Sequence, residues 1–71
     1  MTEVVAIKQF ENVRFEVYEE EPNAYYKIVK MDLKEPKIEK IIEAYSKVDA
    51  MTKYHKEIYS YLESEMKKQY E

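Results

Sequence analysis

The chain contains no glycine and no cysteine, and it has only one histidine, two prolines and no tryptophan. Without cysteine it can form neither a disulfide bond nor a thiolate metal site, and one histidine is too few for an imidazole zinc site. The absence of glycine excludes phosphate-binding loops that depend on close backbone approach. We therefore expect no metal, no cofactor, no small-molecule substrate and no enzymatic activity.

The length of 71 residues predicts one small domain over residues 1–71. A chain of this size buries only about 60% of its unfolded surface, so a single core is marginal unless something reinforces it. The usual reinforcements are disulfides, a structural metal or oligomerisation. The sequence excludes the first two, and we therefore expect self-association.

Charged residues make up 38% of the chain, with a net charge of −3. No segment is basic enough to follow a phosphate backbone by electrostatics alone, which disfavours nucleic-acid binding. The apolar run of residues 4–7 is interrupted at Lys8, so it is too short for a signal peptide or a membrane span. The expected location is cytoplasmic, without membrane contact.

The first half of the chain predicts antiparallel strands. Residues 13–18 alternate between apolar and polar side chains, the period of a half-buried strand. Residues 4–7 form either a separate short strand or the start of the same one, with a turn or bulge near Glu11-Asn12. Turn formers at 19–23 then precede a second strand at 24–33, in which Tyr26 and Ile28 share a face.

The second half of the chain predicts one long helix, because residues 36–71 contain no glycine and no proline beyond Pro36. Their apolar residues recur at helical spacing, which gives a rod of roughly 50 Å. The expected fold class is α+β. A short antiparallel β-hairpin or three-stranded meander (1–35) is followed by one long amphipathic helix (36–71), and the protein is oligomeric through this helix.

The apolar faces of the two halves of this helix differ in direction by roughly 100°. A continuous helix would pack its first half on the hairpin and its second half on a partner helix. Alternatively, the helix breaks near 46–52, where Ser46 and Asp49 have the spacing of a helix start, and two antiparallel helices result. The absence of glycine and proline favours continuity. Either way, Tyr54, Ile58, Tyr61 and Leu62 need contacts that a 35-residue hairpin cannot easily supply.

The predicted oligomer or partner interface lies on the second half of the helix. It consists of Met51, Tyr54, His55, Ile58, Tyr59, Tyr61, Leu62 and Met66. His55, the only imidazole, could act as a general base or a pH switch. No serine or cysteine stands at motif spacing to it, so we interpret it as a histidine within the interface.

The alternative function is a nucleic-acid-binding transcriptional regulator with a dimeric hairpin. Aromatic and basic side chains on a sheet can form a platform for single-stranded nucleic acid. The candidate contacts are Arg14, Tyr25, Lys27 and Lys30. Neighbouring carboxylates at residues 19–21 would repel phosphate.

The segment Ile7-Lys8-Gln9-Phe10-Glu11-Asn12, followed by Val13-Arg14 and an aromatic strand, resembles the first hairpin of phage antirepressor N-terminal domains. The likeness covers about a third of the chain. The Leu-Gly-Tyr that follows in that family is absent, so the family's DNA-binding role is not carried over. We expect a small protein-interaction or regulatory factor of phage, prophage or mobile-element type. It would act by homo-oligomerisation and by binding a host or phage protein.

Overall fold

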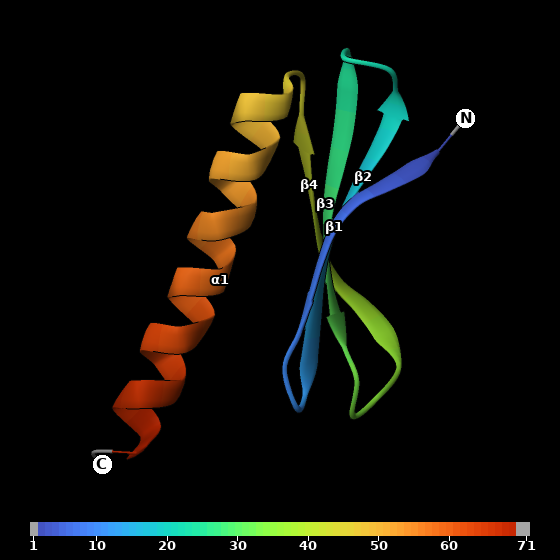
Figure 1. Cartoon of the computed structure of the whole chain (residues 1–71). Helices are drawn as coiled ribbons and strands as arrows, with labels where there is room; N and C mark the ends of the chain where they lie inside the picture. Colours follow the sequence, from blue (N-terminus) through green and yellow to red (C-terminus); the bar gives the residue numbers. More distant parts are fainter. Residues whose placement is uncertain (1, 70–71) are drawn as a thin grey trace.

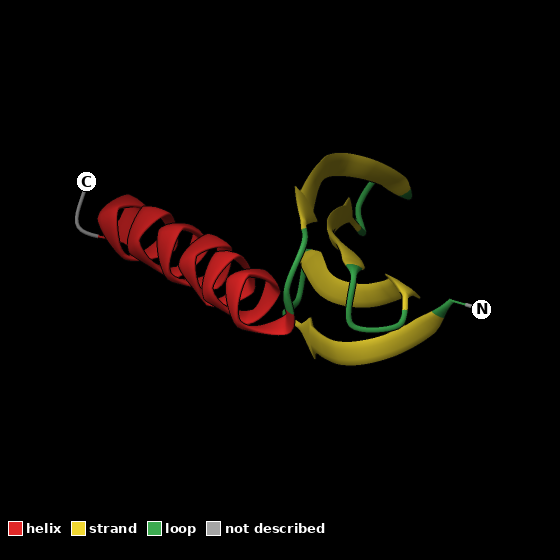
Figure 2. Ribbon diagram, turned by 90° about the horizontal axis from the view of Figure 1, so that it is seen from above, coloured by secondary structure: helices red, strands yellow, loops and turns green. Residues whose placement is uncertain are grey.

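The computed structural model describes residues 2–69 and shows an α+β fold, as the sequence predicts (Figure 1). A four-stranded antiparallel sheet contains β1 (Glu3–Gln9), β2 (Val13–Glu21), β3 (Tyr25–Asp32) and β4 (Lys37–Ala44), which lie side by side in chain order. One helix, α1 (Lys47–Gln69), follows β4 and lies against one face of the sheet. Figure 2, seen from above, shows the curvature of the strands and α1 projecting to one side of them.

The first three strands lie where the sequence predicts them, with residues 3–9 as a separate strand, but β2 continues through Glu21, past the predicted end at residue 18. The turn between β2 and β3 contains Asn23, which has a φ of 58°. Asparagine tolerates this left-handed conformation better than most residues, which allows a tight reversal in a chain without glycine. Tyr26 and Ile28 lie buried on the same face of β3, in register with Ala44 and Ile42 of β4.

The prediction of helix over residues 36–46 is wrong, because residues 37–44 form β4. The register of β3 with β4 passes from Lys40 to Ile38 and leaves Glu39 as a bulge. A bulge shifts the alternation of side chains, so the apolar residues of β4 recur at 38, 41 and 42. That spacing is also the spacing of a helical face. Residues 70 and 71 of the predicted helix lie outside the described residues.

The helix begins at Ser46, where the sequence offered a possible break. The Ser46 hydroxyl oxygen accepts a hydrogen bond from the Asp49 backbone N–H at 3.1 Å, and the Ser46 carbonyl accepts one from the Ala50 N–H at 2.9 Å. Ser46 is therefore the N-cap. The alternative prediction, in which the helix breaks near 46–52, located this helix start correctly. The segment before the start is a strand, however, and not a second helix.

Two lysine contacts attach α1 to β4. The Lys53 ammonium donates to the Glu43 carbonyl at 2.9 Å. Farther along the helix, Lys40 of β4 forms a salt bridge of 3.2 Å with Glu57. These contacts join the helix to β4, the strand from which the two-residue connection at 45–46 leads into α1.

The core lies between α1 and the sheet, and it includes residues that we had expected to need a partner. Tyr54 is buried, and Ile58 and Tyr61 are partly buried against the same cluster. The Tyr61 ring lies 5.1 Å from Phe10 and 5.9 Å from Phe15, measured between ring centroids. Tyr54, Ile58 and Tyr61 therefore contact the chain's own core, because a four-stranded sheet offers α1 a wider surface than the predicted hairpin would.

A hydrogen bond from Tyr26 organises the loop between β2 and β3. The buried Tyr26 donates its phenolic O–H to the Glu19 carboxylate at 2.8 Å. The same carboxylate oxygen accepts the Asn23 backbone N–H at 3.3 Å. The hydrogen bond to Glu19, together with burial, raises the pKa of Tyr26 above its ordinary value of 10.0.

Replacing the N-cap tests the start of the helix. Ser46→Ala removes the acceptor of the Asp49 N–H, and we expect a loss of about 1 kcal/mol in the free energy of unfolding, measured with urea. The control is Ser60→Ala in the helix interior, which should be neutral or slightly stabilising because alanine is the better helix former. An unfolding midpoint equal for Ser46→Ala and wild type would contradict the assignment of the cap.

Replacing Tyr26 tests its bond to Glu19 through the pH dependence of stability. Tyr26→Phe should unfold more easily than wild type below pH 10.0, where tyrosine is protonated in both the folded and the unfolded chain. The difference should shrink as the pH rises from there through the raised pKa of Tyr26, because the unfolded state then releases the proton first. Urea titrations on both sides of this range measure the difference, with Tyr59→Phe as the control. A difference independent of pH would refute the bond.

Candidate protein-interaction groove

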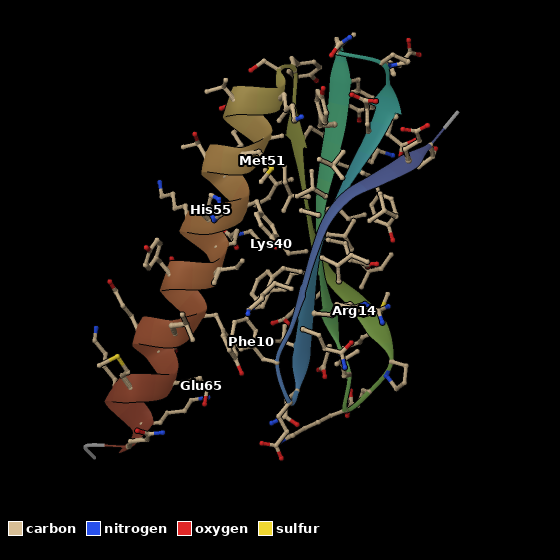
Figure 3. All side chains as sticks on the ribbon, viewed as in Figure 1. Phe10, Arg14, Lys40, Met51, His55 and Glu65 are labelled. Atoms are coloured by element: carbon tan, nitrogen blue, oxygen red, sulfur yellow. The ribbon has the colours of Figure 1, made fainter. Side chains whose placement is uncertain are left out.

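The helix covers only part of the sheet. Its backbone comes close to β2, β3 and β4 but not to β1. In Figure 3, Met51 and Phe10 lie between α1 and the sheet, whereas Arg14 lies on the far side of the sheet. The inner face of β1 therefore remains beside the helix without being covered by it.

A groove of about 290 Å³ follows the side of α1 that faces β1. Its lining is mostly apolar. One wall contains Lys8 of β1, and the rest comes from the helix residues Tyr54, His55, Ile58, Tyr59 and Leu62. We call this the β1–α1 groove.

Large apolar side chains continue along the solvent side of the helix next to the groove. Val48 is 79% exposed, Tyr59 68%, Met66 56% and Leu62 38%. At 100° per residue, these side chains lie about 120° away from the side of α1 that packs on the sheet. We call Val48, His55, Tyr59, Leu62 and Met66 the outer stripe. The fold thus leaves one apolar strip of the helix in solvent while burying another.

The eight predicted interface residues divide between these two sides. Tyr54, His55, Ile58, Tyr59 and Leu62 line the β1–α1 groove. Met51 and Tyr61 pack against the core, and Met66 is exposed on the outer stripe. Sequence reasoning missed Lys8 as part of the groove, because a lysine in an apolar strand carries no signal of what lies beside it. It also placed Val48 on the helix face assigned to the hairpin.

His55 lies at the edge of the groove. It is exposed, and its ring centroid is 5.2 Å from that of Tyr54. Among residues 2–69, no hydrogen bond of the His55 side chain and no cluster of three potential metal ligands is present. The geometry gives His55 apolar neighbours and no reacting partner in that part of the chain.

A second groove, of about 560 Å³, lies on the other side of α1, between its C-terminal half and the ends of the strands. Four lysines (residues 30, 34, 40 and 68) and four carboxylates (residues 32, 39, 57 and 65) line it. Salt bridges join Lys30 to Glu39 at 3.7 Å, Lys40 to Glu57 at 3.2 Å and Lys68 to Glu65 at 3.5 Å. The opposite charges balance, so this groove has no preference for an ion of either sign.

The candidate nucleic-acid contacts do not share one face. Strand alternation places Arg14, Tyr25 and Lys27 on the face of the sheet away from α1, and Lys30 on the face toward it. Arg14 lies 3.6 Å from the buried Glu16, and Lys27 is in register with Glu43. The Tyr25 ring stacks on Tyr45 at 5.5 Å. Arg14 and Lys27 on the outer face thus each have a carboxylate beside them. The predicted nucleic-acid platform is split between the two faces of the sheet.

The face of the sheet away from α1 also exposes apolar side chains. Val4 and Ile7 of β1 and Ile38 and Ile41 of β4 are each about half exposed. This surface could not be predicted from the sequence, because residues 38 and 41 were assigned to a helix. The buried Glu16, which accepts a hydrogen bond from the Tyr18 hydroxyl at 2.7 Å, lies between these two apolar edges.

Among residues 2–69 the structure contains one helix, α1, and this helix is not long and apolar enough to cross a membrane. Comparison with protein-family models, with curated proteins and with solved structures finds no match to this chain. The features of this chain that bear on its function are therefore the β1–α1 groove and the outer stripe.

Proposed function

We propose that this protein is a non-enzymatic interaction factor that self-associates through the β1–α1 groove and the outer stripe of α1. The observation that carries the proposal is the exposure of Tyr59, Leu62 and Met66 in one apolar strip beside a groove. Helices of globular proteins normally present charged and polar residues on the side away from the core. A second apolar side requires a separate explanation.

Burial of this strip would also supply the reinforcement that a chain of this size needs. Apolar surface removed from water contributes about 25 cal/mol per Å². Aromatic residues and methionine are enriched in protein interfaces, where tyrosine can keep its hydroxyl in water while the ring is buried. The outer stripe combines Tyr59 with Leu62 and Met66, a composition suited to contact with another protein.

Replacing Tyr59 tests the proposal, because its exposed side chain makes little contribution to the core. Tyr59→Glu should keep the helix content measured by circular dichroism and weaken self-association by more than about tenfold, since it brings two carboxylates into one apolar contact. Sedimentation velocity over a concentration series measures the association. The wild-type chain should associate at concentrations of about 100 µM.

The matched control is Tyr45→Glu, which changes a tyrosine of nearly the same exposure, 67%, outside the groove and the stripe. This variant should associate as the wild type does. A wild-type chain that stays monomeric throughout the series would refute the proposal. Equal association of Tyr59→Glu and wild type would show that the contact lies elsewhere.

A further inference from the structure

The outer stripe has the spacing of a coiled-coil seam. Its residues follow one another at alternating intervals of four and three when Thr52 and Gln69, which are also exposed, are added. The series is Val48, Thr52, His55, Tyr59, Leu62, Met66 and Gln69. Intervals of four and three are the a and d positions of a heptad, whose side chains meet those of a second helix. Thr52 is compatible with such a seam, because its hydroxyl already donates to the Val48 carbonyl at 2.8 Å.

We propose that the occupant of this seam is a second copy of the chain, with its α1 antiparallel to the first. The inference rests on the self-association proposed above and adds its orientation and register. In the antiparallel arrangement, a positions pack against d positions of the partner. Tyr59 would then pack against the partner's Leu62, and His55 against the partner's Met66. The helices would overlap from residue 52 to residue 69, about 27 Å.

Charge on the flank of the seam favours this orientation. Lys56 and Glu63 are both exposed, lie one heptad apart and occupy the same flanking position. In the register above, Lys56 of each copy lies beside the partner's Glu63, which gives two opposite-charge contacts. In a parallel pair the corresponding partner positions are Met51 and Ile58, which cannot neutralise either charge. Complementary charges at such positions determine which partner and which orientation are chosen.

The two charges are also available for an external contact. Among residues 2–69, no salt bridge includes Lys56 or Glu63. They are seven residues apart, so they cannot pair with each other within one helix, where ion pairs join residues three or four apart. An energetic coupling between positions 56 and 63 would therefore have to act between two chains.

Charge reversal provides the test, carried out with the full chain at low ionic strength because exposed charges are screened by salt. Lys56→Glu alone and Glu63→Lys alone should each dimerise about fivefold or more weakly than wild type, since each homodimer then contains two like-charge contacts. An equimolar mixture of the two variants should form a heterodimer about as tight as the wild-type dimer. In that heterodimer both contacts are again of opposite charge. Fluorescence anisotropy with one variant labelled measures the affinity.

The control mixture combines Lys34→Glu, in the turn before β4, with Glu63→Lys. Its two chains carry the same net charges as the first pair, but their charges do not complement each other along the seam. Lys34→Glu alone should dimerise as the wild type does, because it keeps both seam charges. With Glu63→Lys as the labelled chain, its heterodimer with Lys34→Glu should stay weaker than the wild-type dimer, because one of the two seam contacts is then between two lysines. Recovery specific to the first mixture cannot come from changes within one chain, such as altered helix stability.

The outcomes separate the two proposals. A wild-type dimer whose affinity is unaffected by the single reversals, or not recovered by mixing them, would overturn the antiparallel register and leave self-association standing. A monomeric wild-type chain would overturn both proposals. Recovery in the control mixture would attribute the effect to net charge and would also refute the register.

Discussion

The rest of the structure depends on the mismatch in width between one helix and a four-stranded sheet. Adjacent strands are about 4.8 Å apart, so the axes of β1 and β4 are separated by roughly 14 Å, while a helix with its side chains is about 10 Å across. The two-residue connection from β4 keeps α1 on the β4 side, where it also contacts Glu43 and Lys40. The uncovered margin consequently falls beside β1, where the apolar groove lies.

The two sides of α1 differ in chemistry as a result. Toward the ends of β3 and β4, the helix meets lysines and carboxylates that neutralise one another. Toward β1, it presents Tyr59 and Leu62 beside a groove with one lysine in its wall. The helix thus contributes one face to its own core, one flank to a balanced network of charges, and one apolar strip to solvent. Only the apolar strip has no counterpart within residues 2–69.

The sequence predicted much of the fold because most of its local signals agree with the tertiary structure. Alternation at 13–18 and the shared face of Tyr26 and Ile28 correspond to observed features. The turn predicted at 19–23 is confined to residues 22–24, because β2 continues to Glu21. It failed for β4, where lysine and glutamate favour a helix and the bulge at Glu39 imitates helical spacing. Pairing with the open edge of β3 overrides these preferences, and such long-range pairing leaves no local mark on the sequence.

The candidate site was also predictable in part, because local spacing reveals the apolar arc of the helix but not what covers it. The apolar arc of α1 is visible from the spacing alone, and five of its residues line the groove. The division of that arc into a buried side with Tyr54 and Tyr61 and an exposed side with Tyr59 and Met66 depends on the location of the sheet. Without β4 in the prediction, the whole arc had to be assigned to a partner.

The most direct test of self-association through α1 is a nuclear Overhauser experiment on an equimolar mixture of isotope-labelled and unlabelled chain, filtered for contacts between molecules. Such contacts are detected only when protons of two chains lie within about 5 Å, which is the separation of side chains packed across a helix pair. We expect signals between the Tyr59 ring of one chain and the Leu62 methyl groups of the other. Their absence at concentrations where the chain is associated, or contacts confined to the strand edges, would contradict an interface on the outer stripe.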